Sequence, residues 1–473
     1  MTLPSHKTRI VATIGPASAS PAILEQMIRA GMDIARLNFS HGDFSNHQRT
    51  IERIRAAANA IGRPVSILAD LPGPKMRIGL LREEPIQLQA GDQFYLTTDD
   101  IVGDRQRVSV SFASLPKVVG PGDTLVLNDG YIQLEVTAVR GNDVGCIVRV
   151  GGELRSRKGL NLPGTSLGAS AFTERDQECL KFALAQGVDA VSQSFVENAA
   201  DLEAVRRTAR ELSHTPFLIA KIERSSALAR LDEILEAADG VMIARGDLGV
   251  EVPIERIALV QKDIIHRANQ RAKPVIVATQ MLESMTNYRL PTRAEATDVS
   301  NAILDGADCV MLSGESATGA FPVEAVAMLA RIGEAVEARR PRTSVEQMYA
   351  GVDLAGKIRP MHLILVGIEA SLKYLKPAAV FTHTDGGTSA RRLAAFHLPV
   401  WVVAITSNAK TARDLLFSSG VIPVFEPEMP ACWNACLKDW AQRYKLDGDF
   451  AIFTERPSAA QPEINHRMEI VNL

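Results

Sequence analysis

Eight short runs of β-branched and apolar residues constrain the fold of this chain more than any other feature. Each run is followed by a polar or glycine-containing stretch and then by a segment with a helical pattern. The runs are "RIVATIG", "DIARLNFS", "VSILAD", "DAVSQSF", "FLIAKIE", "GVMIARGD", "PVIVATQ" and "CVMLSGE". Because right-handed crossovers bring each parallel strand beside the last, the alternation predicts an α/β protein whose sheet closes into a (β/α)8 TIM barrel. An open doubly wound sheet is the structural alternative.

The segments between these runs carry helix boundary signals. Pro21 opens "PAILEQMIRA" and Gly31 follows it, which is the usual placement of these two residues at helix ends. Thr292 and Glu295 have the spacing of a capping box before "AEATDVSNAIL". The intervening segments are therefore predicted to be helices.

Two further regions depart from this rhythm. The runs "YIQLEVTAV" and "VGCIVRV" alternate with period 2, which predicts an all-β insert after the third barrel strand. Prolines border the insert and suit hinge peptides, so it is expected to close over the barrel as a lid. The last third returns to an α/β pattern. The predicted domains are a discontinuous barrel (1–71 and 165–340), a β-rich lid (72–164) and a C-terminal α/β regulatory domain (341–473).

Composition excludes several classes of protein. The 473 residues include 52 basic and 55 acidic side chains, so no basic field favours a nucleic acid or a membrane as partner, and a small molecule is expected instead. The five cysteines lack CxxC spacing, which favours neither disulfides nor zinc. The sequence shows no signal-peptide core and no stretch near the roughly 20 apolar residues of a membrane span. We expect a cytoplasmic location.

Polar side chains gather where the predicted barrel strands end, which is where such barrels carry their chemistry. In "ARLNFSHG", Arg36, Asn38 and Ser40 alternate with apolar residues and so share one strand face. Lys221 and Glu223 are likewise two residues apart at the end of a buried run. For the segment with Arg36, the alternative is an edge strand with a solvated face. For Lys221 and Glu223, the alternative is a buried structural ion pair.

The next strand ends in Gly246 and Asp247, and Glu223 with Asp247 would offer two hard oxygen ligands of the kind that Mg²⁺ prefers. Thr279 and Ser313 finish the last two strands, where a helix-capping role is the alternative. A divalent-ion site beside cations and hydroxyls suits an anionic substrate and phosphoryl transfer. No GxxxxGK[ST] motif is present, so a P-loop does not hold the nucleotide.

Seven segments together resemble one family. They are "TRIVATIGPAS", "ARLNFSHGD", "KGLNLPG", "AKIE", "DGVMIARGDLGVEVP", "ATQMLESM" and "PTRAEATDVSNAILDGADCVMLSGESATG", and they resemble the barrel motifs of the pyruvate kinase family in the same order. The resemblance implies transfer of a phosphoryl group from phosphoenolpyruvate to ADP, giving pyruvate and ATP. It also implies Mg²⁺ as cofactor, with Mn²⁺ as an alternative, and a homotetramer.

The resemblance further implies residue roles. Lys221 would neutralise the phosphoryl group in flight, Arg36 would grip the phosphate, and Thr279 would belong to the proton route to the enolate. Glu223 and Asp247 would hold Mg²⁺. The implied substrate-binding residues are Arg36, Lys221, Gly246, Asp247, Thr279 and Ser313. The implied nucleotide-binding residues are Asn38, Phe39, Ser40, His41, Arg77 and Lys158.

The stretch "LADLPGPKMRIG" departs from most of the family, which resembles "DTKGPEIRTG" here and requires K⁺. In that family K⁺ sits among oxygens matching Asn38, Ser40, Asp70 and the Leu71 carbonyl. The chain is similar to the potassium-independent branch, where a lysine replaces the glutamate. The hypothesis is that the Lys75 ammonium stands in for K⁺, so that K⁺ is not required; an incidental surface lysine is the alternative.

The C-terminal domain resembles the allosteric domain of the family more faintly. "THTDGGTSARR" follows a predicted strand and opens a helix, so its amides and hydroxyls could cradle a phosphate. A phosphorylated sugar or a nucleotide is the expected effector, and an ordinary turn is the alternative. The candidate effector residues are Thr382, Thr384, Gly387, Thr388 and Ser389.

Two other functions remain open for the whole protein: a metal-dependent barrel lyase or aldolase acting on pyruvate-like acids, and a non-catalytic metabolite sensor.

Overall fold

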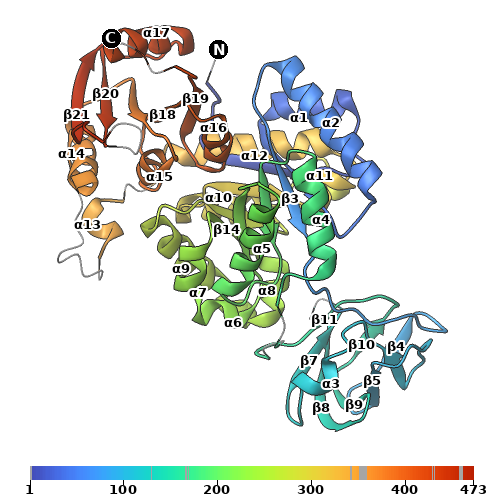
Figure 1. Cartoon of the computed structure of the whole chain (residues 1–473). Helices are drawn as coiled ribbons and strands as arrows, with labels where there is room; N and C mark the ends of the chain where they lie inside the picture. Colours follow the sequence, from blue (N-terminus) through green and yellow to red (C-terminus); the bar gives the residue numbers. More distant parts are fainter. Residues whose placement is uncertain are drawn as a thin grey trace.

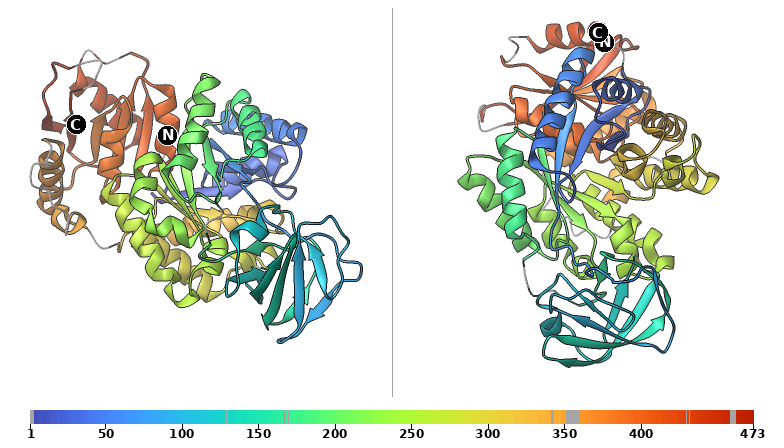
Figure 2. Two further views of the ribbon diagram at one scale, coloured as in Figure 1. Left: turned by 60° about the horizontal axis from the view of Figure 1, so that its bottom comes forward. Right: turned by 90° about the vertical axis from the view of Figure 1, so that its right-hand side faces the viewer.

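The computed structural model describes residues 3–128, 130–165, 168, 170–340, 343–350, 360–428, 430, 432–457 and 462–473. It has three bodies: a barrel, a β-rich insert and a C-terminal α/β domain (Figure 1). The insert and the C-terminal domain lie at opposite ends of the barrel, as both views in Figure 2 show.

Eight parallel strands close the barrel and confirm the predicted fold, which rules out the open doubly wound sheet. Their order around the barrel is β1-β16-β15-β14-β13-β12-β3-β2. Each strand coincides with one of the eight predicted runs. The strands are β1 (Arg9–Thr13), β2 (Met32–Asn38), β3 (Ser66–Leu71), β12 (Ala190–Gln193), β13 (Phe217–Ile222), β14 (Gly240–Ala244), β15 (Val275–Ala278) and β16 (Cys309–Leu312).

Helices surround this barrel because apolar residues on their inner faces pack against the strands. The predicted caps form: Gly31 has φ 126° after the first helix, and Thr292 and Glu295 make a reciprocal capping box. The longer helices are α1 (Pro21–Ala30), α2 (Phe44–Ile61), α4 (Glu174–Ala185), α5 (Ala199–Glu211), α9 (Ile257–Gln270), α10 (Arg293–Asp305) and α12 (Pro322–Glu337). The shorter ones are α6 (Ser225–Ala229), α7 (Leu231–Ala237), α8 (Arg245–Glu251), η1 (Ile254–Arg256), η2 (Glu283–Thr286) and α11 (Gly314–Ala317).

The insert follows β3 and is built mainly from antiparallel strands around its own apolar core. The predicted period-2 runs form the paired strands β8 and β9. One short helix, α3 (Leu115–Val118), is added to the predicted β structure. The strands are β4 (Ile86–Leu88), β5 (Gln93–Thr97), β6 (Arg107–Ser109), β7 (Thr124–Leu127), β8 (Ile132–Arg140), β9 (Asp143–Val150), β10 (Gly152–Leu154) and β11 (Leu160–Asn161).

The C-terminal domain contains a five-stranded sheet of order β19-β18-β17-β20-β21, in which only β21 is antiparallel to its neighbour. Its strands are β17 (Ala379–His383), β18 (Trp401–Thr406), β19 (Val421–Phe425), β20 (Phe450–Glu455) and β21 (Arg467–Asn472). Its helices are α13 (Val345–Met348), α14 (Pro360–Tyr374), α15 (Thr388–Ala394), α16 (Ala409–Asp414), η3 (Leu415–Phe417) and α17 (Trp433–Tyr444). The predicted start at residue 341 lies outside the described residues, and the other domain boundaries stay predictions.

The C-terminal domain closes the amino end of the barrel. Phe417 stacks on Phe217 with ring centroids 5.2 Å apart and is 1% exposed within the core inside the barrel. Arg413 pairs with Asp189 at 2.7 Å in the same region. The insert instead leaves the chain at Leu71, the carboxyl end of β3. The carboxyl ends of the barrel strands therefore face the insert.

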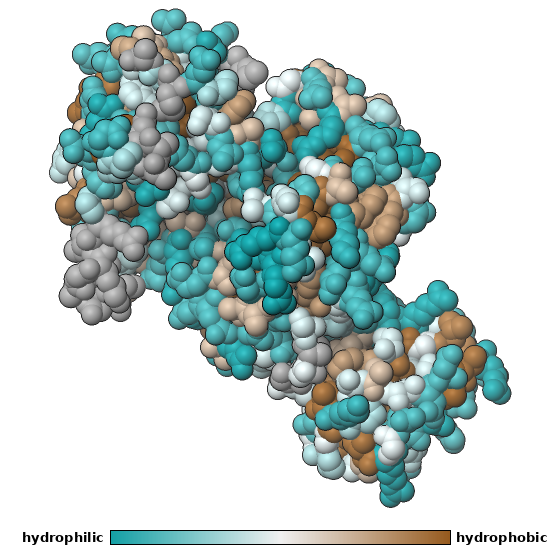
Figure 3. Space-filling model, in the orientation of Figure 1, coloured by the Kyte–Doolittle hydropathy of each residue, from teal (hydrophilic) through white to brown (hydrophobic). Residues whose placement is uncertain are grey.

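Most of the surface visible in Figure 3 is hydrophilic, with apolar residues scattered in small patches. Among the residues that the structure describes, no helix combines the length and the apolar character needed to cross a membrane.

Candidate active site

A cavity of about 90 Å³ lies at the carboxyl ends of the barrel strands. Side chains from β2, β3, β13, β14, β15 and β16 and from the segments that follow them meet in it. The predicted residues that line it are Arg36, Asn38, Ser40, Asp70, Lys75, Lys221, Glu223, Asp247, Thr279 and Ser313. Segments far apart in the sequence thus contribute to one site.

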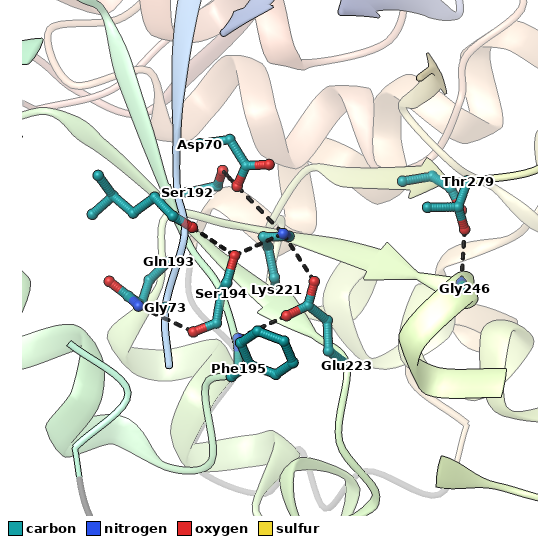
Figure 4. Close-up of polar contacts among 12 residues, drawn as sticks. Asp70, Gly73, Ser192, Gln193, Ser194, Phe195, Lys221, Glu223, Gly246 and Thr279 are labelled. Carbon is teal, nitrogen blue, oxygen red and sulfur yellow. Dashed lines mark hydrogen bonds and ion pairs between the residues drawn. The ribbon is translucent and has the colours of Figure 1, made fainter. Parts of the chain in front are cut away.

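The ammonium of Lys221 lies at the centre of this site (Figure 4). It is 2.7 Å from Ser194 Oγ, 2.9 Å from Glu223 Oε1 and 3.4 Å from Asp70 Oδ1. Burial disfavours the charged form, but the carboxylates of Asp70 and Glu223 outweigh it and raise the pKa of Lys221. Lys221 is therefore a fixed cation that is only 9% exposed.

Asp70 is the shared counter-ion of both cations. Its Oδ2 accepts a 2.8 Å hydrogen bond from Arg36 Nε, and its Oδ1 accepts one of 2.7 Å from Ser192 Oγ. Burial by itself would raise the pKa of Asp70, but Lys221, Arg36 and the hydrogen bonds outweigh it and lower the pKa to about 2. The carboxylate is thus ionised at any physiological pH.

Arg36 is held from two sides. Besides Asp70, its Nη1 donates to Thr13 Oγ1 at 2.8 Å, and Thr13 in turn donates to the Leu312 carbonyl at 2.8 Å. This chain of contacts crosses from β2 through β1 to β16. The guanidinium is therefore oriented before any substrate binds, which lowers the entropy cost of binding an anion.

Glu223 and Asp247 both line the cavity and fit a divalent ion. Glu223 is 2% exposed, and its Oε2 accepts a 2.7 Å hydrogen bond from the Phe195 amide, which fixes the carboxylate. Within the described part of the chain, no three His, Cys, Asp or Glu side chains cluster as a complete metal cage. Two carboxylates leave coordination positions for water and substrate oxygens, and Mg²⁺ commonly binds in this way.

The turn after β15 is strained. Thr279 and Gln280 have φ of 68° and 53°, a conformation that is costly for residues with a side chain. The Thr279 hydroxyl accepts from the Gly246 amide at 2.8 Å and donates to the Ala278 carbonyl at 2.6 Å. Arg245 holds the Thr279 carbonyl at 2.9 Å. These contacts fix the hydroxyl and the Gly246 backbone side by side, as Figure 4 shows.

The comparisons with known proteins agree with this geometry. The family model described as "Pyruvate kinase, barrel domain" matches residues 5–326, and the one described as "Pyruvate kinase, alpha/beta domain" matches residues 364–454. The chain belongs to the pyruvate kinase family. It is accordingly a phosphotransferase enzyme.

Relatives with this name cover most of the chain. Pyruvate kinase of Thermococcus litoralis is 47% identical over 424 residues, which are 89% of this chain and 89% of the relative. Pyruvate kinase of Mycobacterium intracellulare is 41% identical over 429 residues, covering 90% and 89%. Human pyruvate kinase PKLR is 41% identical over 444 residues, covering 91% and 77%.

Lys75, the predicted substitute for K⁺, is an exposed residue that lines the same cavity as Asn38, Ser40 and Asp70. Partial burial lowers the pKa of its ammonium, and Arg77 and Lys221 lower it further, while the carboxylates of Asp247 and Glu223 oppose the shift. The Lys75 charge is therefore part of the electrostatics of the proposed metal site.

A second cavity, of about 700 Å³, adjoins the first one at Asn38, which lines both. His41 lines this second cavity, and burial together with Lys75, Arg77 and Arg36 lowers the pKa of its imidazole. Phe39 does not line either cavity: it is 4% exposed and stacks on His47 with ring centroids 4.3 Å apart. Of the predicted nucleotide-binding residues from 38 to 41, Asn38 and His41 thus line the second cavity, Ser40 lines the first and Phe39 lines neither.

Arg77 and Lys158 belong to the insert and line neither of these two cavities. Arg77 Nη1 donates to the Arg157 carbonyl at 2.8 Å, and the Lys158 carbonyl accepts from the Ile78 amide at 2.9 Å. Both residues therefore lie on the two adjacent chain segments that join the insert to the barrel.

The predicted effector residues lie at the carboxyl end of β17 and the start of α15. Gly387 has φ 78° and precedes the helix. Thr382, Thr384 and Ser389 are buried, and the hydroxyls of Thr384 and Ser389 lack a hydrogen-bond partner within the described part of the chain. The loop therefore has polar groups whose hydrogen-bonding capacity is unused.

The sequence analysis missed several residues of the site. Ser192 and Ser194 hold Asp70 and Lys221, and Ser194 also donates to the Leu71 carbonyl at 2.6 Å. Their positions two residues apart in the fourth run were a usable signal, because they share a strand face with the site. Nothing in the sequence indicated that the Phe195 amide would bind Glu223.

Proposed function

We propose that the chain is a Mg²⁺-dependent pyruvate kinase that transfers the phosphoryl group of phosphoenolpyruvate to ADP, giving pyruvate and ATP, without a requirement for K⁺. The observation that carries the proposal is the buried Lys221 ammonium, 2.9 Å from Glu223 and 2.7 Å from Ser194. A phosphoryl group in transfer carries its charge on peripheral oxygens, so catalysis depends on positioned cations rather than on a nucleophilic side chain.

Lys221 and Arg36 would bind the phosphoryl group of the substrate. Both are buried, both are oriented by Asp70, and neither needs to rearrange when the charge on the phosphoryl oxygens develops. Lys221 would stay with the phosphoryl group during transfer, and Arg36 would hold it at the start.

Glu223 and Asp247 would hold the divalent ion, for which we propose Mg²⁺, with Mn²⁺ as a substitute. When bound, the ion neutralises negative charge and orients the oxygens of both substrates. The Gly246 backbone, Thr279 and Ser313 would bind the carboxylate of the substrate. The strained turn at Thr279 keeps its hydroxyl beside that carboxylate, on the proposed proton route to the enolate.

Lys75 would replace the monovalent cation. A lysine in place of glutamate changes the local charge by two units, and one unit charge at about 4 Å contributes about 4 kcal/mol at an effective dielectric of about 20. The ammonium lines the cavity with Asn38, Ser40 and Asp70, which match the oxygens around K⁺ in the family.

The nucleotide would occupy the second cavity, which Asn38 and His41 line, and would extend toward Ser40 in the first cavity. Arg77 and Lys158 would reach the nucleotide when the insert closes, which is the expected role of a lid on hinge peptides. Phe39 would support the nucleotide-binding segment after β2 through its packing on His47, which lines the second cavity.

The proposal also includes an effector site and an oligomeric state. A phosphorylated sugar or nucleotide would bind at Thr382, Thr384, Gly387, Thr388 and Ser389, where two buried hydroxyls lack partners within the described residues. We also propose a cytoplasmic homotetramer. Exposed apolar residues on two bodies support two kinds of subunit contact: Ile254, Leu259, Tyr288 and Leu290 on the barrel, and Leu363, Tyr374 and Ile470 on the C-terminal domain.

A coupled assay for pyruvate tests the function. The purified enzyme is incubated with phosphoenolpyruvate, ADP and MgCl₂ in Tris buffer, with and without KCl. We expect ADP-dependent release of pyruvate at the same rate in both buffers, and its loss when the divalent ion is chelated. Strong activation by KCl would contradict the role of Lys75. Release of pyruvate without ADP would instead indicate transfer of the phosphoryl group to water, and no release of pyruvate at all would favour a lyase or a sensor.

A further inference from the structure

The chain returns from the insert to the barrel through residues 162–165, here called the return hinge. The charged side chains of Arg224 and Glu251 contact the return hinge. The proposed reaction uses neither of them. Arg224 is 2% exposed, and its Nη2 donates to the carbonyls of Leu162, at 3.3 Å, and Thr165. The carboxylate of Glu251 accepts a hydrogen bond from the Gly164 amide.

A buried arginine without charge partners would be strongly destabilising. Arg224 Nε lies 3.1 Å from Glu197 Oε1, and Arg224 also interacts electrostatically with Glu251. Glu251 in turn accepts from the Ser225 amide at 3.3 Å and from the Ser225 hydroxyl at 3.1 Å. Arg224, Glu251 and the return hinge therefore form one connected polar network.

The positions of these two residues in the chain link the network to the proposed metal site. Arg224 directly follows Glu223 just beyond the end of β13, and its backbone is still extended, with φ −122° and ψ 145°. In an extended backbone successive side chains point to opposite sides, and Glu223 lines the cavity whereas Arg224 does not. Glu251 ends α8, the helix that contains Asp247. Each proposed metal ligand thus shares a short rigid segment with one residue that holds the return hinge. Figure 1 shows α6 and α8 on the side of the barrel that faces the insert.

We propose that Arg224 and Glu251 form a hinge clamp that couples the position of the insert to the geometry of the two metal-binding carboxylates. Arg224 and Glu251 are positioning residues, and this inference rests on the proposed function because it takes Glu223 and Asp247 as the metal ligands. Coupling is reciprocal: if the clamp aligns the carboxylates for the ion, the bound ion also stabilises the clamped hinge.

The first test measures Mn²⁺ binding to the full-length enzyme without substrates, by titration with detection of free Mn²⁺ by electron paramagnetic resonance. Arg224→Met removes the guanidinium while keeping most of the side-chain length. We expect it to raise the dissociation constant of Mn²⁺ by about 5- to 150-fold, the range of typical coupling energies. Arg224→Lys should restore part of the affinity, because the charge returns without the forked geometry.

Arg206→Met is the matched control. The Arg206 guanidinium also donates to a backbone carbonyl, that of Ala237 at 2.9 Å, and pairs with Asp239 at 2.9 Å, but it belongs to α5 and contacts no residue of the return hinge. Its Mn²⁺ affinity should match that of the wild type within about twofold. Thermal denaturation of all variants reports a purely structural effect separately.

The second test follows trypsin cleavage at Arg155, Arg157 and Lys158, which precede the return hinge in sequence. We expect saturating Mn²⁺ to slow this cleavage in the wild type, and the protection to be lost in Arg224→Met. If Arg224→Met fails to fold, Glu251→Gln takes its place in both tests, with the same expected changes.

Two results would overturn the clamp. They are a folded Arg224→Met enzyme whose Mn²⁺ affinity lies within twofold of the wild type, and equal protection of the hinge by Mn²⁺ in both enzymes. The variant Glu223→Gln shows whether the clamp alone is wrong or whether the assignment of the metal ligands is wrong. If Glu223→Gln binds Mn²⁺ as the wild type does, the assignment of the metal ligands is wrong and the clamp falls with it. If Glu223→Gln loses Mn²⁺ but Arg224→Met does not, only the clamp is wrong.

Discussion

Replacement of Asp70 by asparagine tests how the site keeps two cations buried together. The pKa of Asp70 is lowered from 3.8 to about 2 in the folded enzyme, which corresponds to about 2.5 kcal/mol of stability at neutral pH. Because the folded-state pKa is the lower one, this contribution is complete above about pH 5 and decreases as the pH falls through 3.8 towards 2. At pH 3 about half of it remains.

Asp70→Asn also leaves Arg36 and Lys221 without their shared counter-ion. Removal of one partner from a buried ion pair costs about 3 to 5 kcal/mol, so we expect a loss in that range at pH 7. Urea denaturation of wild type and variant from pH 7 to pH 3 measures it, and the difference between them should shrink by about 1 kcal/mol over this range. A difference below about 1 kcal/mol at pH 7, or one independent of pH, would refute the assignment of Asp70 as counter-ion.

Three further predictions concern other parts of the chain. Burial raises the pKa of Asp308 from 3.8 to about 6, so the folded state loses stability as the pH rises from about 4 through 6; denaturation should therefore show the stability of Asp308→Asn relative to the wild type increasing by about 2.5 kcal/mol between pH 4 and pH 7. Gly73 has φ 65°, and a Cβ there would lie 2.9 Å from the Phe195 ring and 3.0 Å from Ser194 Cβ, so Gly73→Ala should cost about 1 to 3 kcal/mol in thermal denaturation. Lys75→Glu should make turnover depend on KCl; equal rates with and without KCl would contradict the proposed role of the lysine.

The barrel could be predicted from the sequence because each strand has a local signal. A run such as "FLIAKIE" is apolar where the strand is buried and becomes polar where it ends, and the segments between the runs carry helix boundary signals such as Pro21 and Gly31. The same reasoning found the convergence of Arg36, Lys221 and Glu223, because strand alternation and the closed parallel sheet fix where the last residues of each strand point. These signals are contained within single segments.

The remaining features of the site depend on distances between segments. The positive φ of Thr279 has no local cause in its sequence and is held by contacts from Gly246 and Arg245. The role of Asp70 as counter-ion appears only when β2, β3, β12 and β13 are placed side by side in the barrel. Strand β21 was not predicted, because "RMEIVN" is partly exposed at the edge of its sheet and lacks a clear alternation.

The central claim is that the buried Lys221 ammonium is the catalytic cation. The most direct measurement is the turnover of Lys221→Met with phosphoenolpyruvate, ADP and MgCl₂, together with its melting temperature. We predict a folded enzyme whose kcat is lower by about 100-fold or more, the cost of removing one preorganised group that stabilises charge in the transition state. A folded variant that turns over within about twofold of the wild type would contradict the account.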